Sequence, residues 1–98
     1  MSRPARALPV DLAPEPWPDM PSEDPYGEVA RQFVLRLEKA LGDEGPRRVA
    51  ARAGIGRTTL YNVLSGRTWP DLATIARLEK ALGTDLWPSV KPPGGKRS

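Results

Sequence analysis

The chain of 98 residues contains no cysteine and no histidine. This absence excludes disulfides, thiol chemistry, imidazole acid–base catalysis and nearly every transition-metal site. No apolar run approaches the roughly 20 residues that a membrane-spanning helix requires. No apolar segment follows Arg3 and Arg6 as it would in a signal peptide. We therefore expect no enzyme, no metal, no cofactor and no membrane segment, and a cytoplasmic location.

Proline is abundant, with 12 residues, but unevenly placed: seven lie within residues 1–25 and three within residues 88–98. Because proline fits neither the inside of a helix nor a central strand, regular structure is expected between these clusters. Residues 1–24 are predicted to be a disordered, acidic, proline-rich arm, and residues 89–98 a flexible tail. Trp17 and Met20 are apolar exceptions in the arm, for which docking on the domain, docking on a partner and exposure to solvent stay open.

Charge separates the arm from the rest of the chain. Residues 1–28 carry two basic and six acidic side chains, a balance of −4, and residues 29–98 carry thirteen basic and six acidic ones, a balance of +7. A basic domain favours a polyanionic partner, and a solvated basic surface is the alternative.

Apolar side chains recur at spacings of three and four through residues 25–88, which indicates helices and no strand. The first helix is expected to begin after Asp24, a good N-cap, and to end at Gly42. Three shorter helices and one further turn are expected to follow, at residues 46–53, 57–65, 72–82 and 85–87. The sequence therefore predicts an all-α domain of four to five helices.

Residues 46–66, PRRVAARAGIGRTTLYNVLSG, have the pattern of a helix-turn-helix motif. A small residue, Ala50, stands where the two helices must approach each other. Gly54 supplies the left-handed turn residue, and Ile55 supplies the apolar side chain that fills the angle between the helices. Leu60 faces inward from the second helix. An ordinary helical hairpin does not need all of these features together, so the motif is the preferred interpretation.

This pattern resembles the Cro/phage-repressor family of helix-turn-helix proteins, also called the XRE family, over about residues 28–88. The resemblance rests on small and apolar scaffold positions of the motif and of the helix after it: Val49-Ala50, Ala53-Gly54-Ile55, Leu60, Val63, Gly66, Pro70, Leu72, Thr74, Ile75, Leu78 and Ala81-Leu82-Gly83. It implies a compact lambda-repressor-like, DNA-binding domain at residues 25–88, with double-stranded DNA as its partner. It also implies that the helix at residues 57–65 enters the major groove.

The resemblance places DNA contacts on the outward face of that helix and close to it. Base contacts are expected from Arg57, Thr58, Tyr61 and Asn62. Arginine can pair with guanine, asparagine with adenine, and threonine can meet a thymine methyl group. Phosphate contacts are expected from Arg47, Ser65, Arg67, Thr68 and Trp69. A solvated helix face is the alternative for each of these residues.

Three positions need separate interpretation. Pro46 stands where the family often has a glutamine that contacts phosphate, so the resemblance does not extend to that contact. Leu64 stands where many relatives have an acidic residue paired with an arginine of the first helix, and apolar packing is expected instead. Trp87 is expected in the core or at a dimer surface rather than on DNA.

These features predict sequence-specific binding of double-stranded DNA by a transcriptional repressor or other regulator, nucleoid-associated in the cytoplasm. Because one such domain reads only half of a palindromic site, a homodimer is expected. The alternative is an antitoxin of a toxin–antitoxin module, whose acidic arm binds a protein partner and which regulates its own operon. The arm has two further interpretations, an internal competitor of DNA and a plain solubilising tail.

Overall fold

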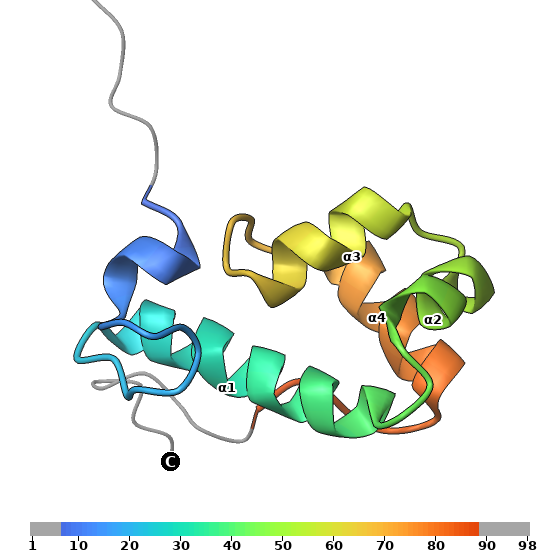
Figure 1. The fold of residues 1–98 in the computed structure, drawn as a ribbon, viewed down its shortest axis with the longest axis horizontal. Coiled ribbons are helices and arrows are strands. Elements are labelled where there is room, and N and C mark those ends of the chain that lie inside the picture. The colour runs from blue at the N-terminus through green and yellow to red at the C-terminus, as the bar shows by residue number, and fades with distance from the viewer. Residues whose placement is uncertain (1–6, 89–98) are drawn as a thin grey trace, which may run out of the picture.

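A computed structural model describes residues 7–88, and within this range the chain is helical without strands (Figure 1). Its elements in chain order are the short 3-10 helix η1 (Pro9–Leu12) and the helices α1 (Pro25–Leu41), α2 (Pro46–Ala53), α3 (Arg57–Leu64) and α4 (Leu72–Leu82). The all-α prediction is confirmed, with four α-helices in the described range and no further helical turn at residues 85–87. The predicted tail, residues 89–98, lies outside the described residues, as do residues 1–6 of the arm.

The helix boundaries follow the local sequence. The carboxylate of Asp24 accepts two backbone N–H groups in the first turn of α1, at 2.8 and 2.9 Å, and that of Asp71 accepts one in α4, at 2.7 Å. At their other ends, α2 and α4 stop at Gly54 and Gly83, whose φ angles of +74° and +67° suit glycine. These local signals are why helix limits could be predicted from the sequence. No helix among residues 7–88 has the length and apolar character needed to cross a membrane.

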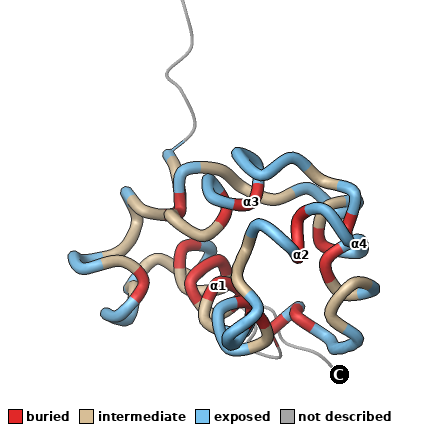
Figure 2. Tube along the Cα trace, turned by 45° about the vertical axis from the view of Figure 1, so that its right-hand side comes forward, coloured by how far each residue is buried: buried red, intermediate tan, exposed pale blue. Residues whose placement is uncertain are grey.

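All four helices contribute to one apolar core (Figure 2). Leu64 packs against this core at its edge. Apolar packing was predicted here because this chain has a leucine where many relatives have an acidic residue. After α4 it is Leu86 that is fully buried, whereas Trp87 is 57% exposed and is not a core residue. The buried members of the core are Phe33, Val34, Leu37, Leu41, Val49, Ala50, Ala53, Leu60, Val63, Ile75, Leu78 and Leu86.

Residues 7–24, which we call the N-terminal segment, follow a defined path over the domain, whereas the sequence predicted disorder over residues 1–24 (Figure 1). The segment contacts α1 through η1. Trp17 packs against the core, while Met20 remains exposed. Two physical effects explain the order: burial of the indole favours docking, and the prolines leave the free chain less conformational entropy to lose.

The carboxylate of Glu28 joins the N-terminal segment to α1. It accepts hydrogen bonds from the backbone N–H of Ser22 at 2.8 Å, from the guanidinium of Arg31 at 2.9 and 2.7 Å, and from the amide of Gln32 at 2.8 Å. The buried Arg31 also donates to the carbonyl of Pro18 at 3.0 Å. These bonds, above all those from Arg31, lower the pKa of Glu28 to about 2.

Acid should weaken the fold through Glu28. Its pKa is about 2 in the folded protein against an ordinary value of 4.5, so its charge stabilises the fold fully above pH 4.5, and this contribution is lost as the pH falls through 2. Glu28→Gln should lower the free energy of unfolding at pH 6 by on the order of 2 kcal/mol, and by much less at pH 2. Urea unfolding of both proteins at pH 6, 4 and 2 tests this. A difference that stays constant over the series would show that the charge does not matter.

Candidate nucleic-acid interface

The helices α2 and α3 form the two arms of a helix-turn-helix. After α2, the chain turns at Gly54, and the backbone N–H of Ile55 donates to the carbonyl of Ala50 at 3.0 Å. The small Ala50 is buried, and Ile55 packs against the core from a half-buried position. The small residue, the turn residue and the filling residue therefore lie where the sequence predicted them.

The two faces of α3 differ sharply in exposure. Leu60 and Val63 are fully buried and attach the helix to the core. The four residues expected to contact bases, Arg57, Thr58, Tyr61 and Asn62, are all exposed. Residues three and four positions apart share one face of a helix, so these four side chains lie together on the outward face of α3.

The outward face of α3 keeps its polar groups available. Within residues 7–88 no hydrogen bond or ion pair engages the side chain of Arg57, Thr58, Tyr61 or Asn62. The ion pairs of the described range join Arg31 to Glu28 and Arg52 to Glu44, so neither connects the acidic N-terminal segment with α3. The described contacts thus give no support to the interpretation of this segment as an internal competitor of DNA.

The residues expected to contact phosphate lie on α2 and around the loop between α3 and α4. Arg47 is exposed in the first turn of α2, and Arg67 is exposed just beyond α3. Ser65 and Thr68 are half-buried, and the Ser65 hydroxyl donates to the carbonyl of Asn62 at 3.3 Å. The two arginines are therefore the better placed of these four residues for contact with a polyanion.

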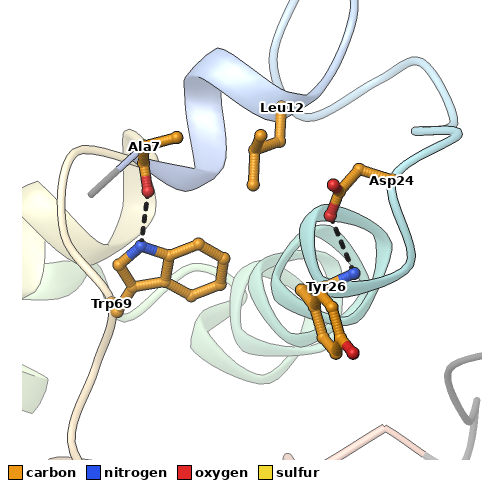
Figure 3. Close-up of a pocket in the computed structure, with 5 residues that line it drawn as sticks. All are labelled: Ala7, Leu12, Asp24, Tyr26 and Trp69. Atoms are coloured by element: carbon orange, nitrogen blue, oxygen red, sulfur yellow. Dashed lines mark hydrogen bonds between the residues drawn. The ribbon is translucent and has the colours of Figure 1, made fainter. Parts of the chain in front are cut away.

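Trp69 is held by the N-terminal segment. Its indole N–H, which was expected to reach a phosphate, donates to the carbonyl of Ala7 at 2.8 Å (Figure 3). The indole also lines a surface pocket of about 450 Å³, together with Ala7, Leu12, Asp24 and Tyr26. None of the other residues expected to touch DNA lines this pocket. The structure therefore connects Trp69 with α1 and the N-terminal segment.

Charge is concentrated around the helix-turn-helix. Residues 45–70 contain five arginines and no acidic residue. Two arginines already have partners within the fold. Arg52 of α2 is paired with Glu44 and lowers the pKa of its carboxyl. Arg77 of α4 donates to the carbonyl of Gly54 at 3.4 Å. Arg48 is exposed beside Arg47 and was missing from the predicted contacts. A local charge count over the motif would have indicated it.

In the described part of the chain, no group of three or more acidic side chains could hold a metal ion. The exposed face of α3 and the nearby arginines instead provide hydrogen-bond donors and positive charge, which are the groups that recognise nucleic acid.

Comparisons with known proteins agree with this geometry. A family model described as helix-turn-helix matches residues 46–86. The crystal structure of the restriction-modification controller protein C.AhdI from Aeromonas hydrophila is similar, with a TM-score of 0.50 and 25% sequence identity, over 55% of this chain and 85% of that one. A comparison with curated protein sequences gave no match. Residues 46–86 thus match the helix-turn-helix family model, and the fold around them is similar to that of a restriction-modification controller protein.

Proposed function

We propose that this protein binds double-stranded DNA in a sequence-specific manner, with α3 as the recognition helix in the major groove, and that it represses or otherwise regulates transcription. The observation that carries this proposal is the division of α3 into a buried apolar face and an exposed polar face. The major groove is wide enough to admit one helix, and there each base pair presents a distinct pattern of donors and acceptors.

The chemistry of the outward face suits base recognition. Arg57, at the N-terminus of α3, can donate two parallel hydrogen bonds to guanine, and Asn62 can pair with adenine in the same bidentate way. Thr58 can contact a thymine methyl group, and Tyr61 extends the same exposed face. We assign base recognition to these four residues.

Phosphate contacts fix the register of a protein on DNA without reading its sequence. We assign them to the exposed Arg47, Arg48 and Arg67, with Ser65 and Thr68 as additional hydroxyl donors. Trp69 is left out of this assignment because its indole N–H already donates to Ala7.

The role as a regulator is supported by the similarity to C.AhdI, which is a controller protein of a restriction-modification system. For the present chain we propose a regulator that binds an inverted repeat on the nucleoid. Two copies would bind together, because one domain reads only a half-site. The antitoxin alternative needed a free acidic arm, and residues 7–24 are instead packed on the domain. It is therefore not proposed.

Selection of bound fragments from a pool of random DNA duplexes by the full chain tests this function. We expect enrichment of two inverted half-sites with centres about one helical turn, roughly 10 base pairs, or a multiple of it apart. Enrichment of a lone half-site would remove the homodimer from the proposal. A pool that shows no enrichment at all would overturn sequence-specific binding.

The role of Arg67 predicts a change in salt dependence. Arg67→Ala should weaken binding to every duplex by a similar factor, because a phosphate contact carries no sequence information. It should also lower the slope of log affinity against log salt concentration by about 1. Fluorescence anisotropy at several salt concentrations measures both effects. Lys39→Ala removes the same charge from an exposed position on α1 and should leave the slope nearly unchanged. Equal slopes for the wild type and Arg67→Ala would remove Arg67 from the phosphate contacts.

A further inference from the structure

The C-terminal end of α3 is completed by a residue from far away in the sequence. The last carbonyls of a helix have no partner within the helix itself. At this end the carbonyl of Asn62 accepts the backbone N–H of Arg67 at 2.9 Å, and that of Val63 accepts the N–H of Gly66 at 3.1 Å. The carbonyl of Leu64 accepts the indole N–H of Trp17 at 2.9 Å, across 47 positions of sequence. Trp17 thus caps the last residue of the helix.

Two more hydrogen bonds join the N-terminal segment to the chain that follows α3. The backbone N–H of Val10 donates to the carbonyl of Gly66 at 2.9 Å. Further along, the indole of Trp69 donates to the carbonyl of Ala7 (Figure 3). Residues 64–69 are therefore held at three points by a segment that lies outside the helix-turn-helix.

Gly66 makes this close approach possible. It is buried, with a φ of +73°. A Cβ atom at this position would lie 2.8 Å from Cε2 and 3.0 Å from Cζ2 of Trp17, and 3.0 Å from Cβ of Val10. The backbone after α3 therefore lies directly against the indole ring and leaves no room for a side chain there.

We infer that the N-terminal segment is the C-terminal cap of the recognition helix, and that Trp17 is a positioning residue for DNA recognition. The inference rests on the proposed function and adds a determinant outside the helix-turn-helix. Trp17 acts through the end of α3 and through the adjoining loop, which carries Arg67 and Thr68 toward phosphates. If this loop shifts, the phosphate contacts no longer hold α3 in register with the bases.

Specific and nonspecific binding should respond differently to the loss of this cap. Nonspecific binding depends mainly on net charge and tolerates small displacements. Specific binding requires that α3 and its phosphate contacts fit at the same time. A purely structural role of Trp17 would reduce only the fraction of folded protein, so both affinities would fall by one factor and their ratio would stay the same.

The test uses full-length Trp17→Phe, which loses the N–H donor and keeps a ring, and Trp17→Ala, which loses both. Affinities are measured for the duplex selected by the wild type and for a scrambled duplex, at one salt concentration and with all proteins folded. We expect about threefold weaker binding to the selected duplex for Trp17→Phe and about tenfold for Trp17→Ala, with less than about a twofold change on the scrambled duplex. Met20→Ala, in the same segment but 44% exposed, is the control and should change neither affinity.

Glycine substitutions provide an independent, matched comparison. Gly66 and Gly83 both have positive φ, but a Cβ at Gly83 meets no atom within 4 Å. Gly66→Ala should therefore lower the ratio of selected to scrambled affinity about as much as Trp17→Ala, whereas Gly83→Ala should leave the ratio unchanged. Combined with Trp17→Ala, the Gly66→Ala substitution should lower the ratio by less than it does alone, because the indole it displaces is already gone.

Amide hydrogen exchange separates a failure of this inference from a failure of DNA binding. In Trp17→Phe and Trp17→Ala, the N–H groups of Gly66 and Arg67 should exchange faster, while those of α4 keep their wild-type rates. If no duplex is selected, the proposed function fails, and these exchange rates alone decide whether the cap exists. Unchanged exchange, or an unchanged affinity ratio on a duplex that the wild type does select, overturns the positioning role.

Discussion

Leu60→Ala should lower the free energy of unfolding by about 3 kcal/mol, within the usual range of about 2 to 5 for a buried leucine. Leu60 is fully buried on the inner face of α3, in the core shared with the other helices. Removing three carbon atoms there loses their transfer from water and leaves a cavity that close-packed neighbours fill only in part. Equilibrium unfolding in urea measures the change directly.

The control for Leu60→Ala is Leu72→Ala, the same substitution at the first residue of α4. Leu72 is 80% exposed, so its removal should change the free energy of unfolding by less than about 0.5 kcal/mol. A domain of this size typically has a stability on the order of 5 to 10 kcal/mol, so a loss of about 3 kcal/mol removes roughly a third to more than half of it. Similar losses for the two variants would mean that α3 is not attached to the core through Leu60.

The parts of the fold that could be predicted from the sequence are those determined by neighbours along the chain. Asp24 and Asp71 accept N–H groups two or three residues ahead, and a glycine with positive φ ends each of α2 and α4. The apolar spacing of three and four identified the buried faces because a helix repeats every 3.6 residues. Each of these signals lies within one or two helical turns, which is why the boundaries of the four helices could be predicted from the sequence.

The N-terminal segment could not be predicted in this way. Its composition is typical of disorder, and its anchors pair residues 47 and 62 positions apart. Both of these bonds end on main-chain carbonyls, those of Leu64 and Ala7, which carry no sequence signal. Trp17, the single aromatic residue of this proline-rich segment, was the available indication that the segment has something to bury.

The candidate site also has one part that could be predicted from the sequence and one part that could not. The outward face of α3 follows from helix geometry once the motif is found, so Arg57, Thr58, Tyr61 and Asn62 could be placed together from the sequence. The environment of Trp69 could not, because its hydrogen-bond acceptor belongs to the N-terminal segment. Local geometry thus gives the reading face, and the tertiary structure determines which neighbouring donors are still available to phosphates.

Replacing the base-contacting side chains should have the largest effect on recognition. Arg57→Ala and Asn62→Ala should each weaken binding to the selected duplex by roughly tenfold to a hundredfold, because a bidentate pair contributes about 1 to 3 kcal/mol of discrimination. Both residues are exposed and attach nothing to the core, so the free energy of unfolding should change little. Anisotropy titrations with selected and scrambled duplexes give the two affinities.

The scrambled duplex and a charge control separate base recognition from simple attraction. Asn62→Ala changes no charge and should leave binding to the scrambled duplex unaltered, whereas Arg57→Ala should weaken it slightly through the lost positive charge. Lys80→Ala removes the same charge from an exposed position on α4 and should match that slight loss without any loss of discrimination. Repeating the selection with Arg57→Ala should then relax the preference at one position of each half-site, because the guanidinium is the group that distinguishes the base there. If Arg57→Ala and Lys80→Ala lower both affinities equally, the outward face of α3 does not read bases and the major-groove assignment is wrong.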